Sequence, residues 1–263
     1  MDWGHENRMA RMIKPSTGRT VMLAIDHGYF QGPTSGLEQP GKTVESIITY
    51  CDALSPTRGV LRYCINPKTD VPIILRISGG NSMARPDDLS DEVVTTCIEE
   101  AIRLNACAVS VSVYVGAANQ RQSIQNLALV VDEAARYGIP VLGITAVGKD
   151  MARDARYLGL ATRILAEVGA HIVKTYYCEN FEQVVRGCPA PIVIAGGKKV
   201  PELEALEFTY KAVNEGAVGV DMGRNIFQSE HPVAMIRAVR AIVHDKASVS
   251  AAHDLFNQLE HEG

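Results

Sequence analysis

The sequence predicts an α/β protein whose fold is a single-domain (β/α)8 TIM barrel. Its length of 263 residues suits one barrel domain. Short apolar runs alternate with amphipathic stretches from one end to the other, which is the pattern of repeated βα units. Eight such runs occur without a glycine-rich nucleotide fingerprint, so a closed barrel is favoured over an open doubly wound sheet.

The eight candidate strands are short, and several are nearly all apolar, as expected of parallel strands that are covered on both faces. Between them we expect helices. Ser90 is expected to cap one helix, Pro201 to occupy the first turn of another, and glycines 138, 169 and 216 to end three more. The candidate strands span residues 21–25, 59–63, 72–77, 106–113, 140–145, 171–176, 191–195 and 219–222.

We expect one barrel domain over residues 1–263, because no linker or change of composition marks a boundary. Residues 1–18 are expected to form an amino-terminal segment, and residues 246–263 a carboxyl-terminal helix or tail.

Composition limits the possible partners. The formal net charge is −4 and there is no long run of Lys and Arg, which argues against a nucleic-acid or anionic-membrane surface. The six cysteines form no C-x-x-C pair, which fits neither a zinc site nor a disulfide framework. We therefore expect a cytoplasmic protein that binds small molecules and holds no metal.

Lys174 is the most informative residue, because it lies in a run of β-branched and aromatic residues that predicts a buried strand. A lysine there either reaches water or is kept neutral and used as an amine in Schiff-base chemistry. A structural lysine that protects a strand edge is the alternative.

In a barrel of this kind the active site lies at the carboxyl ends of the strands. Asp26 and His27 follow the first candidate strand, and Lys149 follows the fifth. Asp26 is expected to stabilise an iminium and to move protons, and Lys149 to supply a positive charge near Lys174. A helix cap, a turn histidine and a solvated lysine are the alternatives.

Two glycine clusters follow the seventh and eighth candidate strands, the recurrent phosphate position in this fold. Glycine lets the backbone approach an anion, and Arg224 can add a charged fork. The predicted phosphate-binding residues are Gly196, Gly197, Lys198, Gly223 and Arg224.

Three neighbours of Lys174 leave further possibilities open. Tyr176 and Tyr177 point in opposite directions, so at most one should face the barrel interior. A thiol nucleophile at Cys178 with His27 as its base is a rival, against the default of a packed thiol.

Several segments together resemble the archaeal-type class I aldolase family (DeoC/FbaB-like), from Asp2 to about His244. Within this family the likeness is greatest to a thiolase branch. The matching segments are Val-Met-Leu-Ala-Ile-Asp-His-Gly-Tyr-Phe-Gln-Gly-Pro, Val-Gly-Lys-Asp-Met, Lys-Thr-Tyr-Tyr, Pro-Ile-Val-Ile-Ala-Gly-Gly-Lys-Lys and Val-Asp-Met-Gly-Arg-Asn-Ile-Phe-Gln-Ser.

The resemblance places the family's Schiff-base lysine on Lys174 and its first-strand aspartate on Asp26. The phosphate loops fall on the glycine clusters that the barrel argument selects. The sugar-phosphate aldolases of the family carry a catalytic tyrosine after the fifth strand, whereas this chain has Ile144-Thr145-Ala146-Val147-Gly148. This departure favours the thiolase branch.

That branch implies cleavage of a phosphorylated diketone by coenzyme A, as a co-substrate and without a bound cofactor, in degradation of the phosphorylated autoinducer-2 quorum-sensing signal. The alternatives are a class I aldolase acting on a sugar phosphate and a non-catalytic phosphosugar-binding protein. The resemblance also implies a homo-oligomer built as a ring or stacked rings. Relatives tend to carry an amino-terminal extension, so we expect this chain to be short or clipped at that end.

Overall fold

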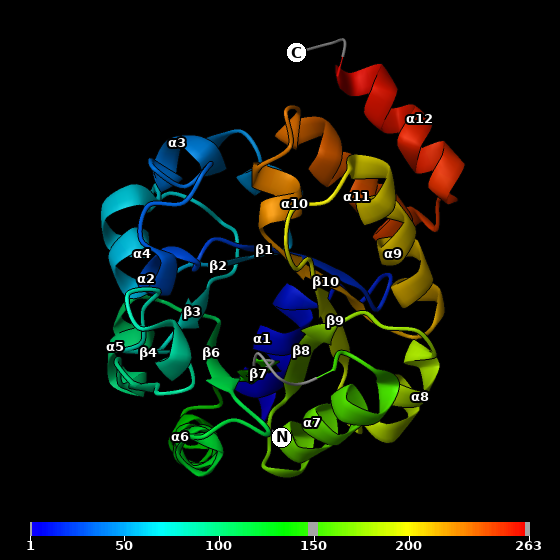
Figure 1. The fold of residues 1–263 in the computed structure, drawn as a ribbon. Helices are drawn as coiled ribbons and strands as arrows, with labels where there is room; N and C mark the ends of the chain where they lie inside the picture. Colours follow the sequence, from blue (N-terminus) through cyan, green and yellow to red (C-terminus); the bar gives the residue numbers. More distant parts are fainter. Residues whose placement is uncertain (1, 147–151, 261–263) are drawn as a thin grey trace.

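A ring of parallel strands forms the centre of the molecule (Figure 1). In the computed structural model, which describes residues 2–146 and 152–260, eight strands follow one another in the order β2-β1-β10-β9-β8-β7-β6-β3. Isolated bridges from Leu54 to Ile73 and from Thr57 to Arg76 join the outer strands and complete the barrel. The predicted fold class is confirmed. The strands are β1 (Thr20–Ala24), β2 (Ala53–Ser55), β3 (Ile74–Arg76), β6 (Ala108–Val113), β7 (Val141–Thr145), β8 (Ile172–Tyr176), β9 (Ile192–Ala195) and β10 (Gly219–Met222).

Helices surround this ring, and a small antiparallel pair, β4 (Ser78–Gly79) and β5 (Val93–Val94), follows β3. The carboxyl-terminal segment forms α12, which lies against α9 and α11 (Figure 1). The helices are α1 (Trp3–Met12), α2 (Gly28–Gln31), α3 (Pro40–Glu45), η1 (Ile48–Tyr50), α4 (Arg58–Cys64), η2 (Pro86–Asp88), α5 (Ile98–Arg103), α6 (Gln120–Ala135), α7 (Ala155–Glu167), α8 (Phe181–Gly187), α9 (Glu202–Asn214), α10 (Arg224–Phe227), α11 (Pro232–Asp245) and α12 (Val249–Glu260).

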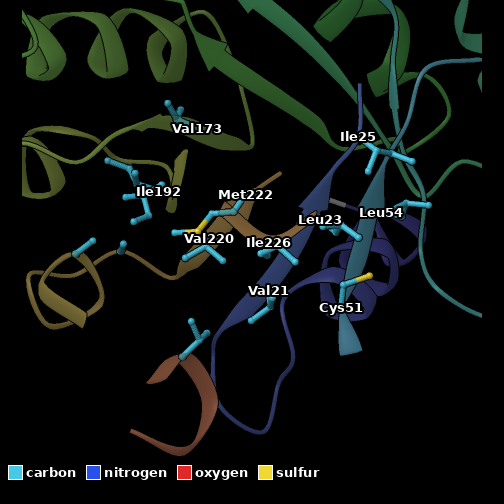
Figure 2. Packing of buried hydrophobic residues seen from close by; sticks show 14 of the residues in the cluster. Val21, Leu23, Ile25, Cys51, Leu54, Val173, Ile192, Val220, Met222 and Ile226 are labelled. Carbon is cyan, nitrogen blue, oxygen red and sulfur yellow. The ribbon is translucent and has the colours of Figure 1, made fainter. Parts of the chain in front are cut away.

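A large hydrophobic cluster between the strands and the helices holds these layers together. Figure 2 shows part of this cluster. It contains Val21 and Leu23 of β1 and Ile25 directly after this strand, which lie near Leu54 of β2 and Val220 of β10. None of these five side chains is more than 1% exposed. Burial of an aliphatic side chain of this size contributes about 1.5–3 kcal/mol, so this layer fixes the strands relative to one another.

A second, smaller cluster fills the inside of the barrel at the amino ends of the strands. Met12, the last residue of α1, is fully buried there with Met22 of β1 and Ile172 of β8. Asp2 caps α1 by accepting a hydrogen bond of 2.7 Å from the amide of His5. Helix α1 therefore closes the floor of the barrel, and the carboxyl-terminal rim is left as its open end.

Asp52, directly before β2, ties α11 to this floor. Its carboxylate accepts hydrogen bonds from the amide of Val21 at 2.7 Å, from Nη1 of Arg240 at 2.9 Å and from Nε2 of His244 at 2.7 Å. It is only 2% exposed. Burial would raise the pKa of Asp52, but the hydrogen bonds from His244, Val21 and Arg240 lower it below its ordinary value.

Two predicted local elements are wrong. Residues 59–63 belong to helix α4, and the second barrel strand is the shorter β2. The Thr57 hydroxyl accepts a hydrogen bond from the amide of Val60 at 3.5 Å and starts the helix. Ser90 caps no helix, since α5 begins at Ile98 after Cys97.

The three glycine stops are confirmed, whereas Pro201 is the N-cap of α9 and lies one residue before the predicted first turn. Gly138, Gly169 and Gly216 follow the ends of α6, α7 and α9 with φ of 61°, 108° and 110°. A positive φ is accessible to glycine without steric cost, so these residues end the helices and turn the chain toward the next strand.

Candidate active site

Lys174 lies inside the barrel toward its open rim. On β8, Ile172 packs in the interior cluster and Val173 in the cluster under the helices, so strand alternation turns Lys174 inward. The residue is 9% exposed, and its register partners on the flanking strands are the apolar Ile144 and Val193. Its Nζ lies 2.8 Å from Oδ2 of Asp221. Lys174 thus faces the barrel interior from an apolar strand, with a buried carboxylate as its partner.

Asp221 is turned inward because its neighbours on β10, Val220 and Met222, pack in the outer cluster. It is 1% exposed, and the Ser55 hydroxyl donates a 3.5 Å hydrogen bond to its Oδ1. Burial raises the pKa of Asp221, although the charge of Lys174 acts in the opposite direction. This carboxyl holds a proton more readily than an ordinary aspartate.

Asp26 follows β1 and faces the same space. Nη1 of Arg76 donates a 3.2 Å hydrogen bond to its Oδ2. Burial alone would raise the pKa of Asp26, but the positive charges of Arg76 and Lys174 lower it below the ordinary value. Asp26 is therefore an ionised carboxylate that a permanent cation fixes in place.

Arg76 is itself held by a buried carboxylate. Its Nε donates to the carbonyl of Ser78 at 2.9 Å, and its Nη2 donates to both oxygens of Glu92 at 3.0 Å. Arg76 is 5% exposed and Glu92 is fully buried. Glu92, Arg76 and Asp26 form a continuous line of alternating charges that leads toward Lys174.

Two tyrosines complete this network at the edge of the cavity. The hydroxyl of Tyr29 donates to Glu92 at 2.6 Å, and that of Tyr114 donates at 2.7 Å. Burial raises the pKa of both phenols. They are therefore protonated donors committed to Glu92, which leaves neither hydroxyl free to replace the tyrosine absent from the fifth strand.

His27 lies beside Asp26, with its Nδ1 3.9 Å from Oδ1 of Asp26. Its ring packs edge-on against Phe227, with the ring centroids 5.8 Å apart. Burial lowers the pKa of His27 to about 4, and the charges of Lys174 and Arg224 add to this against the opposing effect of Asp26. The imidazole is thus neutral at pH 7, and in the described residues its Nδ1 has no hydrogen-bond partner.

The glycine turns after β9 and β10 form the other side of the cavity. Gly197 has φ of 69°, which glycine adopts without strain. A Cβ at Gly223 would lie 2.3 Å from the carbonyl oxygen of Ala24 and 2.6 Å from Cε1 of His27, so no side chain fits there. Arg224 follows, and within the described part of the chain its buried Nε has no hydrogen-bond partner. At Gly197 a Cβ would meet nothing within 4 Å, and this open backbone beside a guanidinium nitrogen without a partner in the described residues suits an anionic ester.

Asn225 fixes the two glycine turns to each other. Its Nδ2 donates to the carbonyl of Gly196 at 2.6 Å and to that of Lys198 at 3.2 Å. Its Oδ1 accepts from the amide of Val200 at 2.9 Å. Asn225 is fully buried, so the turn after β9 and the start of α10 are joined as one unit.

A cavity of about 150 Å³ unites these groups. A larger groove of about 1130 Å³ lies along α3 and α4, but it is lined by none of the predicted site residues. The small cavity brings together seven of the nine predicted site residues, namely Lys174, Asp26, His27, Gly196, Gly197, Gly223 and Arg224.

The remaining two predicted residues are not brought into the cavity by the structure. Lys198 is exposed and does not line it. Lys149 lies outside the described residues. The roles of Lys198 in phosphate binding and of Lys149 beside the amine stay predictions.

The residues after Lys174 separate as strand alternation predicts. Tyr176 lines the cavity, with the guanidinium of Arg153 stacked 3.9 Å from its ring centroid. Tyr177 points away and donates to Glu215 at 2.8 Å. Burial raises the pKa of Cys178 to about 11 and this thiol does not line the cavity, so the structure gives no support to a thiol nucleophile.

Sequence reasoning missed three of the charged groups. Asp221 and Arg76 carried the signal that identified Lys174, a charged residue inside an apolar strand. Glu92 gave no such signal, because it lies in a segment whose burial depends on contacts with distant strands. Together these residues supply the counter-charges of the site.

In the described ranges, no group of three or more His, Cys, Asp and Glu side chains is placed to hold a metal ion. None of the helices there is long and apolar enough to cross a membrane. What the site does contain is a buried amine, two carboxylates of different character and a cradle for an anion. This set can form an imine with a phosphorylated ketone and accept electrons from a breaking carbon–carbon bond.

A buried lysine with an anion cradle at the rim of a (β/α)8 barrel defines an enzyme of the class I, Schiff-base aldolase type. Comparison with known proteins supports this class. Residues 20–229 match the DeoC/LacD family aldolase, and the chain belongs to this family.

Proteins of high identity carry a more specific name. The chain is 54% identical over 257 residues to a protein of Photorhabdus laumondii named 3-hydroxy-5-phosphonooxypentane-2,4-dione thiolase, covering 97% of this chain and 88% of the relative. A protein of Yersinia enterocolitica with the same name is 53% identical over the same coverage. An uncharacterized aldolase of Pasteurella multocida is also 53% identical.

Solved structures agree on the fold. An archaeal fructose 1,6-bisphosphate aldolase superimposes with a TM-score of 0.79 at 23% identity, covering 92% of this chain and 99% of the other. A fructose-bisphosphate aldolase from Slackia heliotrinireducens gives a TM-score of 0.84 at 20% identity, covering 98% and 92%. At these identities the likeness establishes the barrel and not the substrate.

Proposed function

We propose that this chain is a thiolase that cleaves 3-hydroxy-5-phosphonooxypentane-2,4-dione with coenzyme A, giving acetyl-coenzyme A and dihydroxyacetone phosphate. The name of relatives 53–54% identical over nearly the whole chain supports the substrate. The observation that carries the chemistry is one cavity lined by Lys174 and by the anion cradle of Gly197, Gly223 and Arg224. The physiological role is degradation of the phosphorylated autoinducer-2 signal.

In this mechanism Lys174 condenses with the ketone next to the phosphorylated carbon and releases water. The thiolate of coenzyme A then adds to the acetyl carbonyl. The bond between this carbon and the hydroxyl-bearing carbon breaks, acetyl-coenzyme A leaves, and the electron pair moves into the iminium to give an enamine. Protonation of the enamine carbon and hydrolysis of the imine release dihydroxyacetone phosphate and restore the amine.

The cradle has a defined part in this sequence. An ester phosphate bound by Gly197, Gly223 and Arg224 places the adjacent ketone carbon toward Lys174, because all four residues line the same small cavity. Asp26, fixed by Arg76, faces the positive charge of the iminium and stabilises it. Coenzyme A acts as a co-substrate, and no bound cofactor takes part.

A class I aldolase acting on a sugar phosphate is the second candidate, supported by the family and by the fold of the structural neighbours. The end of β7 argues against it. Thr145 stands there, and its hydroxyl donates to the carbonyl of Lys174 at 3.2 Å and contacts the hydroxyl of Thr175 at 2.8 Å. A tyrosine acid and base is absent from this strand end.

The protein is proposed to act in the cytoplasm as a homo-oligomer, a ring or stacked rings.

A coupled assay with and without coenzyme A separates the candidates. The thiolase is expected to form acetyl-coenzyme A from the phosphorylated diketone only when coenzyme A is present. Cleavage of fructose 1,6-bisphosphate at a comparable kcat/KM without coenzyme A would favour the aldolase. Borohydride reduction with dihydroxyacetone phosphate, followed by peptide mass spectrometry, should place the adduct on Lys174. An unchanged adduct in Lys174→Ala would refute this lysine as the nucleophile, and binding without any adduct would favour a phosphosugar-binding protein.

A further inference from the structure

We infer that Asp221 is the catalytic acid and base of imine formation, taking the proton from Lys174 and returning it to the departing hydroxyl, while Asp26 stays ionised throughout. This inference rests on the proposed Schiff-base function of Lys174. It gives Asp221 the proton transfer that the sequence led us to expect of Asp26, and it leaves Asp26 as a fixed negative charge.

The first observation that supports this role is that Asp221 contacts the reacting nitrogen of Lys174. Oδ2 of Asp221 lies 2.8 Å from Nζ of Lys174, within direct proton-transfer distance. Elsewhere in the described chain this oxygen has no hydrogen-bond partner. From the described residues the other oxygen receives only the 3.5 Å contact from Ser55. One face of the carboxylate is thus committed to the amine alone.

The surroundings of Asp26 favour its ionised form, whereas those of Asp221 favour its protonated form. Asp26 is bound by Arg76, a permanent cation, and its pKa is lowered. Asp221 has no such partner among the described residues, is 1% exposed, and has a raised pKa because it is buried. Pairs of acids whose surroundings separate their pKa values in this way divide into a proton carrier and a fixed charge.

Burial also favours this transfer energetically. When the ammonium of Lys174 gives its proton to Asp221, two buried charges become a neutral amine and a neutral acid. Transfer to Asp26 would instead neutralise a carboxylate that Arg76 stabilises as an anion through a 3.2 Å hydrogen bond. The pair of Lys174 and Asp221 therefore reaches the nucleophilic state without leaving a lone charge in the barrel.

Protons and charge balance during imine formation when Lys174 and Asp221 are the exchanging groups. The ammonium gives one proton to Asp221, and the free amine forms a bond to the ketone carbon while the carbonyl electrons move to oxygen. A second proton passes from nitrogen to oxygen within the adduct. Asp221 then gives its proton to the hydroxyl, the carbon–oxygen bond breaks, water leaves, and the iminium carries the original positive charge. Asp221 ends as a carboxylate facing the iminium.

The rate of borohydride trapping with dihydroxyacetone phosphate, measured by mass spectrometry between pH 6 and 9, tests this role. In Asp221→Asn we expect trapping at pH 7 to fall about 10²–10⁴-fold. The residual rate should depend more steeply on pH than in the unchanged protein, because solvent must now accept the lysine proton in place of Asp221. The unchanged protein should show a much flatter profile. Asp26, His27, Arg76 and Arg224 also face this pair, and each is present in both proteins.

Three further measurements keep the outcome decisive. Asp26→Asn should trap more slowly but keep the flat profile, since Asp221 is intact. Asp221→Ala should regain trapping when formate is added, which a purely structural loss would not allow. Glu167→Gln, in an exposed ion pair on α7, should change nothing.

A normal rate and profile in Asp221→Asn, or the steep profile in Asp26→Asn, would overturn the assignment. Lack of formate rescue in a folded Asp221→Ala would also count against it. If the unchanged protein forms no adduct at Lys174, the proposed function fails and this inference fails with it.

Discussion

Glu92 provides the sharpest test of how the site is held together, because every group that its carboxylate contacts donates a hydrogen bond. Glu92→Gln keeps the shape of the side chain but removes its charge and turns one acceptor into an amide donor facing other donors. Arg76 loses a bidentate partner at the same time. The donors to the Glu92 carboxylate are Arg76, Tyr29, Tyr114, Ser78 and Asn81.

The size of the effect follows from burial. Breaking a fully buried ion pair by removing one partner costs about 3–5 kcal/mol. For a protein of this size that corresponds to a fall in Tm of roughly 6–20 °C. Glu167→Gln is the matched control, because Glu167 pairs with Arg163 on the surface of α7 with more than half of each side chain exposed. That change should cost under about 1 kcal/mol.

Urea unfolding followed by circular dichroism, with thermal melts on the same samples, measures both variants. We expect a large loss for Glu92→Gln and a negligible one for Glu167→Gln. A loss below about 1 kcal/mol for Glu92→Gln would contradict the view that this carboxylate anchors Arg76 and, through it, Asp26. The same result would show that the tyrosines and Asn81 find other acceptors.

Three further predictions concern other parts of the molecule. The pKa of His27 is lowered to about 4, so between pH 6.5 and pH 4 the unfolded chain binds a proton at this residue and the folded chain does not. The contribution of His27 to the free energy of unfolding should be complete above pH 6.5 and fall by about 3 kcal/mol toward pH 4. Urea unfolding at a series of pH values should show that this contribution is missing in His27→Gln. Gly223→Ala should raise KM for the phosphorylated substrate at least tenfold, whereas Gly159→Ala, where a Cβ meets nothing within 4 Å, should not. Asp52→Asn should lower the free energy of unfolding at pH 7 by about 1.5–3 kcal/mol without changing kcat. Because the pKa of Asp52 is lowered in the folded state, the urea unfolding curves of Asp52→Asn and of the unchanged protein should converge as the pH falls below the ordinary carboxyl value of 3.8.

The sequence was sufficient for the barrel because most strands are aliphatic runs bounded by glycine or proline. It failed at the second strand for a physical reason. Residues 59–63 form a short apolar run, and periodicity cannot distinguish a strand from a helix over so few residues. Thr57, placed to cap Val60, was the helix signal, while the true strand β2 has only three residues.

The candidate site was predictable where its chemistry depends on strand ends and not where it depends on packing. Lys174, Asp26 and the glycine turns follow from the rule that barrel strands deliver their carboxyl ends to one rim. Asp221 could have been found by asking for every charged residue within an apolar strand. Glu92 could not, since its burial arises only when residues 78–94 fold over the rim and meet Arg76.

Closure of the barrel floor by α1 has a consequence for the order of events. With Met12 filling the amino-terminal mouth, both substrates must enter and both products must depart past the same rim. In the proposed reaction the imine keeps the ketone phosphate half attached to Lys174 while the acetyl thioester leaves through this shared opening. Product release is therefore sequential, with the thioester first and the sugar phosphate second.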